Sequence, residues 1–211
     1  MSTRIVPIAP QLVPALTRLH GESFAGSERT ALGPRYVAAF IDWFRRQPEA
    51  IGLAACVGAA PCGFVVGCPP QLLPSLYRVL LPLAAAGLLL RPWTLVARPV
   101  REMASARLAQ VLCRTRDAGA QLSLTSPTML LETICVADPW RRRGVGQALV
   151  RRFAAEAGAR GIRSLLLTVL PDNTAARQLY ERCGWSATGR GAGRRLYYSR
   201  ALPDPKSGVH A

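Results

Sequence analysis

Acidic residues are scarce in this chain, and lysine is almost absent. Of its 211 residues only 12 are Asp or Glu, against 27 that are Lys or Arg, and the single lysine is Lys206. A net charge of +15 makes nucleic acid the first partner to consider. The arginines are scattered, however, and no aromatic–basic interleaving, helix-turn-helix or RNA-binding motif is present. We therefore expect no nucleic-acid partner; the charge instead steers anionic substrates or favours an anionic membrane surface.

The sequence also lacks the spacings of a metal site. Its six cysteines form no Cys-x-x-Cys pair and no Cys/His cluster, so we expect buried, reduced thiols and no metal. The longest apolar run, residues 79–90, is interrupted by Pro82 and is too short to span a bilayer. The first residues have neither the apolar core nor the cleavage site of a signal peptide. Together these absences predict a cytoplasmic protein.

The most informative stretch present is ICVADPWRRRGVG at residues 134–146. An apolar strand pattern leads into an arginine–glycine turn, and a helical pattern begins at once. Unpaired N–H groups at a helix start and the positive end of its dipole form a site for phosphate. Gly144 and Gly146 leave room for close backbone approach to phosphate oxygens. This order predicts a binding site for a phosphate-bearing cofactor.

The spacing excludes the two commonest nucleotide loops. A Walker loop needs Gly-Lys-Ser/Thr, and a dinucleotide fingerprint needs a third small residue that Leu149 replaces. What remains, Arg141-x-x-Gly144-x-Gly146, resembles the pyrophosphate loop of the GCN5-related N-acetyltransferase (GNAT) superfamily. A second pattern, Asn-x-x-Ala-x-x-Leu-Tyr-Glu-x-x-Gly-aromatic, occupies residues 173–185 and is similar to the second signature of that superfamily. The resemblance covers residues 128–200.

The resemblance implies acetyl-coenzyme A (acetyl-CoA) as co-substrate and direct attack by an amine on its thioester. Backbone N–H groups of residues 142–147 would hold the pyrophosphate, and residues 134–136 would pair with the pantetheine arm like an added strand. Asn173 would either position the cofactor or only cap its helix. The implied cofactor-binding residues are Ile134, Cys135, Val136, Arg141, Arg142, Arg143, Gly144, Val145, Gly146, Gln147 and Asn173.

The resemblance also places catalytic groups. Tyr180 would be the general acid that protonates the departing thiolate, because tyrosine keeps its proton at neutral pH. Glu132, alone in an apolar strand, would be the general base; it lies two and four residues before Ile134 and Val136 and is expected on their face. The alternative for Glu132 is a salt bridge to an arginine. His20 and Glu22, near a helix end, are acceptor-side candidates.

Hydrophobic periodicity, together with the resemblance, predicts an α/β fold with a GNAT-like central sheet, mixed but mostly antiparallel and twisted, flanked by helices. Strands are expected at 4–8, 51–57, 62–67, 129–136, 163–170, 185–188 and 194–200. Helices are expected at 11–23, 34–47, 144–160 and 174–183, and a loop at 26–33. A single acetyltransferase domain would span residues 1–202, with a disordered tail at 203–211.

Residues 69–126 are expected to form a helical insertion that the resembled family lacks. Residues 72–90 are broadly apolar, and residues 99–115 are amphipathic with arginines on the polar side. The insertion either caps the sheet or forms a homodimer face, or residues 72–116 make peripheral contact with a membrane.

Three functions are compatible with these patterns. The leading one is acetyl transfer to a primary amine of a small molecule, such as an amino sugar, an antibiotic-like compound or a metabolite. The second is acetylation of a protein or peptide amine, against which Thr168 counts, because relatives that act on protein N-termini often have a glutamate in that strand. The third, from another class, is a non-catalytic acyl-CoA-binding or membrane-surface module. Acetyl is not distinguished from a longer acyl donor.

Overall fold

The computed structural model describes residues 3–25, 27–90, 127–190 and 195–203. The amphipathic stretch predicted at 99–115 and most of the predicted tail lie outside the described residues. Within them, seven strands form one sheet of order β1-β2-β3-β4-β5-β7-β6. The strands are β1 (Arg4–Pro7), β2 (Ile51–Val57), β3 (Ala60–Cys68), β4 (Thr128–Val136), β5 (Ser164–Val169), β6 (Ser186–Arg190) and β7 (Leu196–Ala201).

All neighbouring strands in the sheet are antiparallel except β4 and β5, which are parallel. This confirms the predicted mixed, mostly antiparallel α/β sheet. The helices are α1 (Val13–Ser23), α2 (Glu28–Ala31), α3 (Pro34–Arg46), α4 (Leu73–Leu90), α6 (Val145–Ala159) and α7 (Thr174–Arg182), with short 3-10 helices at Pro10–Leu12, Pro70–Leu72 and Asp138–Trp140. The loop predicted at 26–33 is partly wrong, because α2 lies inside it.

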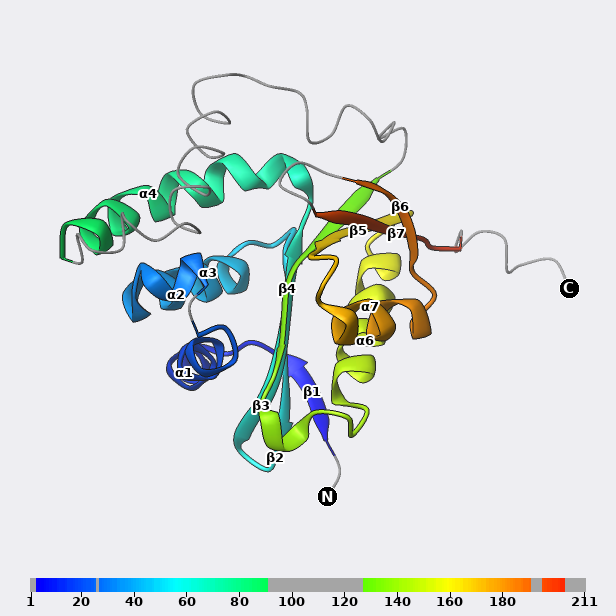
Figure 1. The fold of residues 1–211 in the computed structure, drawn as a ribbon, viewed down its shortest axis with the longest axis horizontal. Coiled ribbons are helices and arrows are strands. Elements are labelled where there is room, and N and C mark those ends of the chain that lie inside the picture. The colour runs from blue at the N-terminus through cyan, green and yellow to red at the C-terminus, as the bar shows by residue number, and fades with distance from the viewer. Residues whose placement is uncertain (1–2, 26, 91–126, 191–194, 204–211) are drawn as a thin grey trace, which may run out of the picture.

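The helices cover the two faces of the sheet in separate groups (Figure 1). Helices α1, α3 and α4 pack on one face, and α6 and α7 pack on the other. On α3 the buried side chains recur at helical spacing, from Tyr36 and Val37 through Phe40 and Ile41 to Phe44. On α6, Leu149, Val150 and Phe153 do the same on the opposite face. The sheet is therefore buried on both sides, as its continuous apolar strands require.

Strands β4 and β5 pair only at their beginnings. Hydrogen-bonded register joins residues 128–130 of β4 to residues 164–166 of β5, and no further β4–β5 pair occurs in the described strands. β4 nevertheless continues to Val136, still paired with β3 on its other side. The second half of β4 therefore has an open edge beside β5, and this edge leads to the start of α6.

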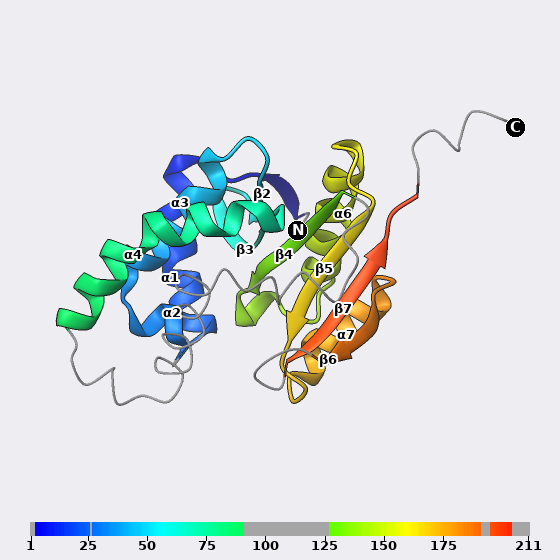
Figure 2. The ribbon, with the colours of Figure 1, turned by 90° about the horizontal axis from the view of Figure 1, so that it is seen from above.

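Helix α4 is longer than the apolar run predicts. It starts at Leu73, directly after a 3-10 turn, and continues through Pro82 to Leu90. The stretch Pro70–Leu90 has 21 residues, and its most apolar 18-residue window has a mean hydropathy of 1.7, so its length and composition would allow it to cross a membrane. The sequence expectation of an insufficient apolar stretch is therefore wrong: Leu72, Leu73 and Leu76 extend the run, and Arg78 is its only charged residue. Figures 1 and 2 show α4 packing across α3 and running away from the sheet.

Candidate active site

The loop before α6 exposes backbone amides. Arg142 has φ of 57° and Gly144 has φ of 83°, both in the left-handed region. The first helical hydrogen bond runs from Ala148 N to Gly144 O, at 2.9 Å. The N–H groups of Val145, Gly146 and Gln147 therefore have no acceptor within α6. The free amides are those that the sequence predicts; that they bind an anion stays a prediction.

The two glycines of this loop serve different purposes. A Cβ at Gly144 would meet no atom within 4 Å, so the positive φ, rather than lack of space, requires glycine there. A Cβ at Gly146 would lie 3.3 Å from Leu179 Cδ2 on α7. Gly146 is thus explained by the close packing of α7 against the start of α6.

The three arginines of the loop are not equivalent. Arg141 Nε donates to Val136 O at 3.0 Å, and its Nη1 lies 2.8 Å from Asp138 Oδ1. Arg141 thus holds the loop to the end of β4. Arg143 places its guanidinium carbon 5.4 Å from the ring centroid of Trp140. Arg142 and Arg143 are exposed, so their charges face solvent at the predicted phosphate site.

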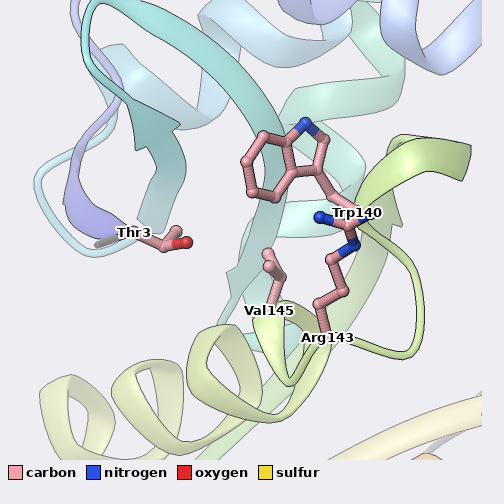
Figure 3. Close-up of a pocket in the computed structure, with 4 residues that line it drawn as sticks. All are labelled: Thr3, Trp140, Arg143 and Val145. Carbon is pink, nitrogen blue, oxygen red and sulfur yellow. The ribbon is translucent and has the colours of Figure 1, made fainter. Parts of the chain in front are cut away.

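A cavity of about 240 Å³ lies between this loop and the beginning of β1. Thr3, Trp140, Arg143 and Val145 line it. Figure 3 shows Thr3 across from the paired Trp140 and Arg143 side chains, with Val145 between them. The cavity adjoins the helix start and has one cationic wall.

Residues 134–136 lie on the open half of β4. Ile134 and Val136 are half-buried and pack against the core beneath α6 and α7. Cys135 points to the other face, where its thiol contacts Leu19 O at 3.7 Å. Burial raises the pKa of Cys135 to about 11. Cys135 can therefore contribute to a bound pantetheine only through its backbone.

Tyr180 lies within the core formed by the sheet, α6 and α7. It is 6% exposed, and its ring centroid is 5.9 Å from that of Trp185 and 6.3 Å from that of Tyr198. Burial, and then the neighbouring Cys183, raise the pKa of Tyr180 above its ordinary value. Tyr180 therefore remains a proton donor throughout the neutral range, as the predicted acid role requires.

Asn173 is the N-cap of α7. Its Oδ1 accepts a hydrogen bond from Ala176 N at 3.1 Å, and the residue is exposed. The helix-capping interpretation is thus observed directly. A role in holding the cofactor stays a prediction.

Glu132 sits at an irregularity in β4. Val66 of β3 pairs with Thr133, and Gly67 pairs with Leu131, so Glu132 is an extra residue without a partner on β3. Such a bulge breaks the alternation of side chains along a strand. Glu132 and Thr133 both contact Arg29, from α2, whereas Ile134 and Val136 face the opposite core. The expectation that Glu132 shares a face with Ile134 and Val136 is therefore wrong.

Arg29 is the site residue that sequence reasoning missed. Its Nη1 donates to Thr133 Oγ1 at 3.0 Å, its Nη2 forms a salt bridge with Glu132, and its guanidinium carbon lies 4.5 Å from the Phe40 ring centroid. Its Nε is buried and has no hydrogen-bond partner among the described residues. The salt-bridge alternative for Glu132 is thus observed, but its partner lies 103 residues away in an expected loop, without any local signal.

The two acceptor-side candidates on α1 differ sharply. His20 is 2% exposed, and its ring centroid lies 4.8 Å from that of Phe24, with the two rings tilted by 44°. Burial, and then the charge of Arg29, lower the pKa of His20 to about 4, so the imidazole is neutral. His20 is thus an interior residue, and its role on the acceptor side stays a prediction. Glu22 is exposed.

The described residues contain no group of three or more His, Cys, Asp or Glu side chains placed to hold a metal ion. Five cysteines in the described ranges are free and buried, which confirms the prediction of reduced thiols for them. These are Cys56, Cys62, Cys68, Cys135 and Cys183.

Comparison with known proteins agrees with this geometry. The profile of the Acetyltransferase (GNAT) family matches residues 13–185, and the search of curated proteins found no match. Ard1 from Thermoplasma volcanium is similar in structure, with a TM-score of 0.60 at 17% identity, covering 97% of this chain and 100% of that one. The ribosomal-protein-S18-alanine N-acetyltransferase from Escherichia coli gives 0.59 at 14% identity, covering 100% of both. PaiA N-acetyltransferase from Thermoplasma acidophilum, solved with coenzyme A, gives 0.56 at 11% identity, covering 96% and 100%.

One class of protein combines these features, namely a partly open parallel strand pair and a helix start with free amides. The family match over most of the chain identifies that class. The chain belongs to the GNAT acetyltransferase family. It is an acetyl-CoA-dependent N-acetyltransferase, and its acceptor is an amine.

Proposed function

We propose that the acceptor is the primary amine of a small molecule and that it attacks acetyl-CoA directly, in a ternary complex. The observation that carries this choice is the distribution of acids on the two strands that flank the opening. β5 has no Asp or Glu, and Thr168 is exposed where relatives acting on protein N-termini often have a glutamate. β4 has one carboxylate, Glu132.

The chain offers complementary groups for the co-substrate. Amides of Val145, Gly146 and Gln147, with the charges of Arg142 and Arg143, suit a pyrophosphate. The open edge of β4 at residues 134–136 suits the amide groups of pantetheine, because extended backbone pairs with extended backbone. Acetyl-CoA, once bound, supplies the thioester carbonyl that the amine attacks.

Two side chains would move protons. Tyr180 would donate its proton to the departing sulfur; its raised pKa keeps the hydroxyl protonated until that step. Glu132 would accept the amine proton through a water. In the structure Arg29 occupies one of its oxygens, so this role requires the second carboxylate oxygen to reach the acceptor.

A protein or peptide amine is the second candidate. Two of the similar structures are Ard1 and the S18-alanine N-acetyltransferase, and the name of the second states that it acts on a protein. Their identities to this chain are 17% and 14%, which supports a shared fold only. The presence of an acid on β4 and the absence of one on β5 favour the small amine.

The test is release of free CoA thiol from acetyl-CoA, in parallel against small primary amines and against peptides with free N-termini. Amino sugars and antibiotic-like amines represent the first group. We expect turnover with at least one small amine and at least tenfold lower kcat/KM with every peptide. The reverse order would establish the protein-amine alternative. Acetyl-CoA binding without turnover in either panel would favour a non-catalytic module. Gly144→Glu serves as the inactive control.

A further inference from the structure

Helix α4 presents an apolar face that no described element covers. We define the outer face of α4 as its exposed residues: Pro74, Arg78, Val79, Leu81, Pro82, Ala85, Ala86, Leu89 and Leu90. Four of these, Val79, Leu81, Leu89 and Leu90, are 52–82% exposed and make up most of the large exposed hydrophobic side chains among the described residues. Contiguous apolar patches of this kind mark interaction sites.

Neither a place in a protein core nor a signal sequence accounts for a helix this hydrophobic. Only 17% of its most apolar window is buried, so α4 is not the central helix of a core. It begins at Leu73, far from the N-terminus, so it is not a signal sequence. The outer face needs an occupant from outside the described structure.

The buried side of α4, which packs on the core, limits how the helix could contact a membrane. Leu76 and Leu80 are buried against the core of α1 and α3, and a Cβ on Gly87 would lie 2.5 Å from Leu32 O. Helix α3 carries the charged group Asp42, Arg45 and Arg46. Ion pairs of this kind are not stable in hydrocarbon. With α3 packed on it, α4 can lie in the membrane plane but cannot cross the bilayer.

Charge distinguishes the possible occupants. The described stretch Pro70–Leu90 has one charged residue, Arg78. Arg78 lies on the outer face of α4, and the helix itself has no acid. A second copy packed face to face would bury Arg78 without a carboxylate partner from α4, which is unfavourable. A lipid phosphate provides that partner, and a long arginine side chain can reach it from the interface.

We propose that the outer face of α4 docks this enzyme on an anionic lipid bilayer, with the helix lying in the interfacial plane. Val79, Leu81, Leu89 and Leu90 enter the acyl boundary, while Arg78 remains at the headgroups. The positive charge of the chain adds attraction to anionic lipid. This inference does not depend on which amine is acetylated.

The test is flotation of the full-length protein with vesicles of phosphatidylcholine alone or of phosphatidylcholine with about 30% phosphatidylglycerol, a composition that supplies the anionic surface. Leu89→Glu is the test variant, and Leu170→Glu is its matched control, because both leucines are exposed, at 82% and 44%, and both changes add one negative charge. Far-UV circular dichroism and thermal unfolding verify that each variant is folded.

We expect wild type to bind the anionic vesicles about tenfold more strongly than the neutral ones, and to lose most of that preference in high salt. Leu89→Glu should bind at least about fivefold more weakly, and Leu170→Glu should bind within about twofold of wild type. No wild-type binding to anionic vesicles would overturn the proposal, as would equal loss in both variants. A dimer that Leu89→Glu converts to monomer, without vesicle binding by wild type, would assign the face to a second copy instead.

Discussion

Arg29 and Glu132 form a salt bridge between α2 and the bulge of β4, across 103 residues of sequence. The same guanidinium also binds the hydroxyl of Thr133. Neighbouring residues of a regular strand point to opposite faces, so one guanidinium could not reach both. The extra residue in β4 places both side chains on the α2 side. Through these two contacts the bulge holds α2 against β4, the strand whose second half has the open edge.

We predict that Arg29→Gln lowers the free energy of unfolding by about 3 kcal/mol, because it leaves the mostly buried Glu132 carboxylate without its counter-charge. The double variant Arg29→Gln/Glu132→Gln should recover at least half of that loss. Urea denaturation measures both. Arg46→Gln is the control, because Arg46 is 69% exposed in its ion pair with Asp42, and it should lose less than about 1 kcal/mol. Equal losses for the two single variants would contradict a special role for the Arg29–Glu132 pair.

Gly144→Glu should abolish the stabilisation by acetyl-CoA. Wild type is expected to gain about 2.7 kcal/mol at a ligand concentration of about 100 times Kd. The variant places a side chain at a positive φ and a negative charge beside the free amides of α6. Gly161→Glu is a matched control, since Gly161 has φ of 78° and open space around it, but lies beyond the opposite end of α6. Both variants should be less stable than wild type, and only Gly144→Glu should lose the ligand-induced shift in Tm. If Gly144→Glu kept the normal ligand-induced shift in Tm, the proposal that the pyrophosphate binds at this helix start would be wrong.

Tyr180→Phe should reduce kcat by about 100-fold and leave acetyl-CoA binding unchanged, because it removes a proton donor to the departing sulfur. The raised pKa of Tyr180 means that the folded protein retains this proton above about pH 10. Any loss of stability from its ionisation should therefore begin only above its ordinary pKa. Steady-state kinetics on the best acceptor, with binding measured separately, checks the prediction. An unchanged kcat would leave Tyr180 as a core residue only.

Glu132→Gln should lower kcat by about 100-fold at neutral pH if Glu132 is the general base. Gln retains an acceptor oxygen for Arg29, so the variant keeps much of the local structure. Asp42→Asn, at another arginine-paired carboxylate, controls for loss of an ion pair. The pH profile of kcat/KM gives the decisive readout: loss of an acidic limb in Glu132→Gln supports the base, and an unchanged limb assigns the carboxylate to positioning.

Stability should fall as the pH drops below 6.5, because of His20. The pKa of His20 is lowered from 6.5 to about 4 by burial, so the unfolded chain takes up a proton that the folded protein resists. The stabilisation is complete above the unfolded pKa and is lost progressively as pH falls from 6.5 to about 4. The free energy of unfolding that is lost over this pH range amounts to about 3 kcal/mol. Thermal unfolding of wild type and His20→Asn across this range and up to neutral pH measures it, and parallel curves for the two proteins would show that another group is responsible.

The conformation of the arginine–glycine loop was predictable because its determinants are local. A strand end, a glycine with positive φ and a helix start follow one another within residues 134–147, so their spacing alone places the free amides. The same holds for Asn173 and Tyr180, which share one helix with its cap. The strands of the mixed sheet were likewise readable from alternation and apolar runs, with small errors at their ends.

The direction of Glu132, the partner it finds and the burial of His20 were decided by tertiary structure. Alternation predicts the face of a strand residue only while its register is unbroken, and the bulge is visible only when β3 lies beside β4. Arg29 comes from a helix that local patterns assign to a loop. The exposed face of α4 was also decided by tertiary structure. Hydropathy measures how apolar a helix is, whereas the elements packed on it decide which of its faces remains uncovered. Local order along the chain thus determined the glycine turn and the free amides at the start of α6, and contacts between distant segments determined the surroundings of Glu132 and His20.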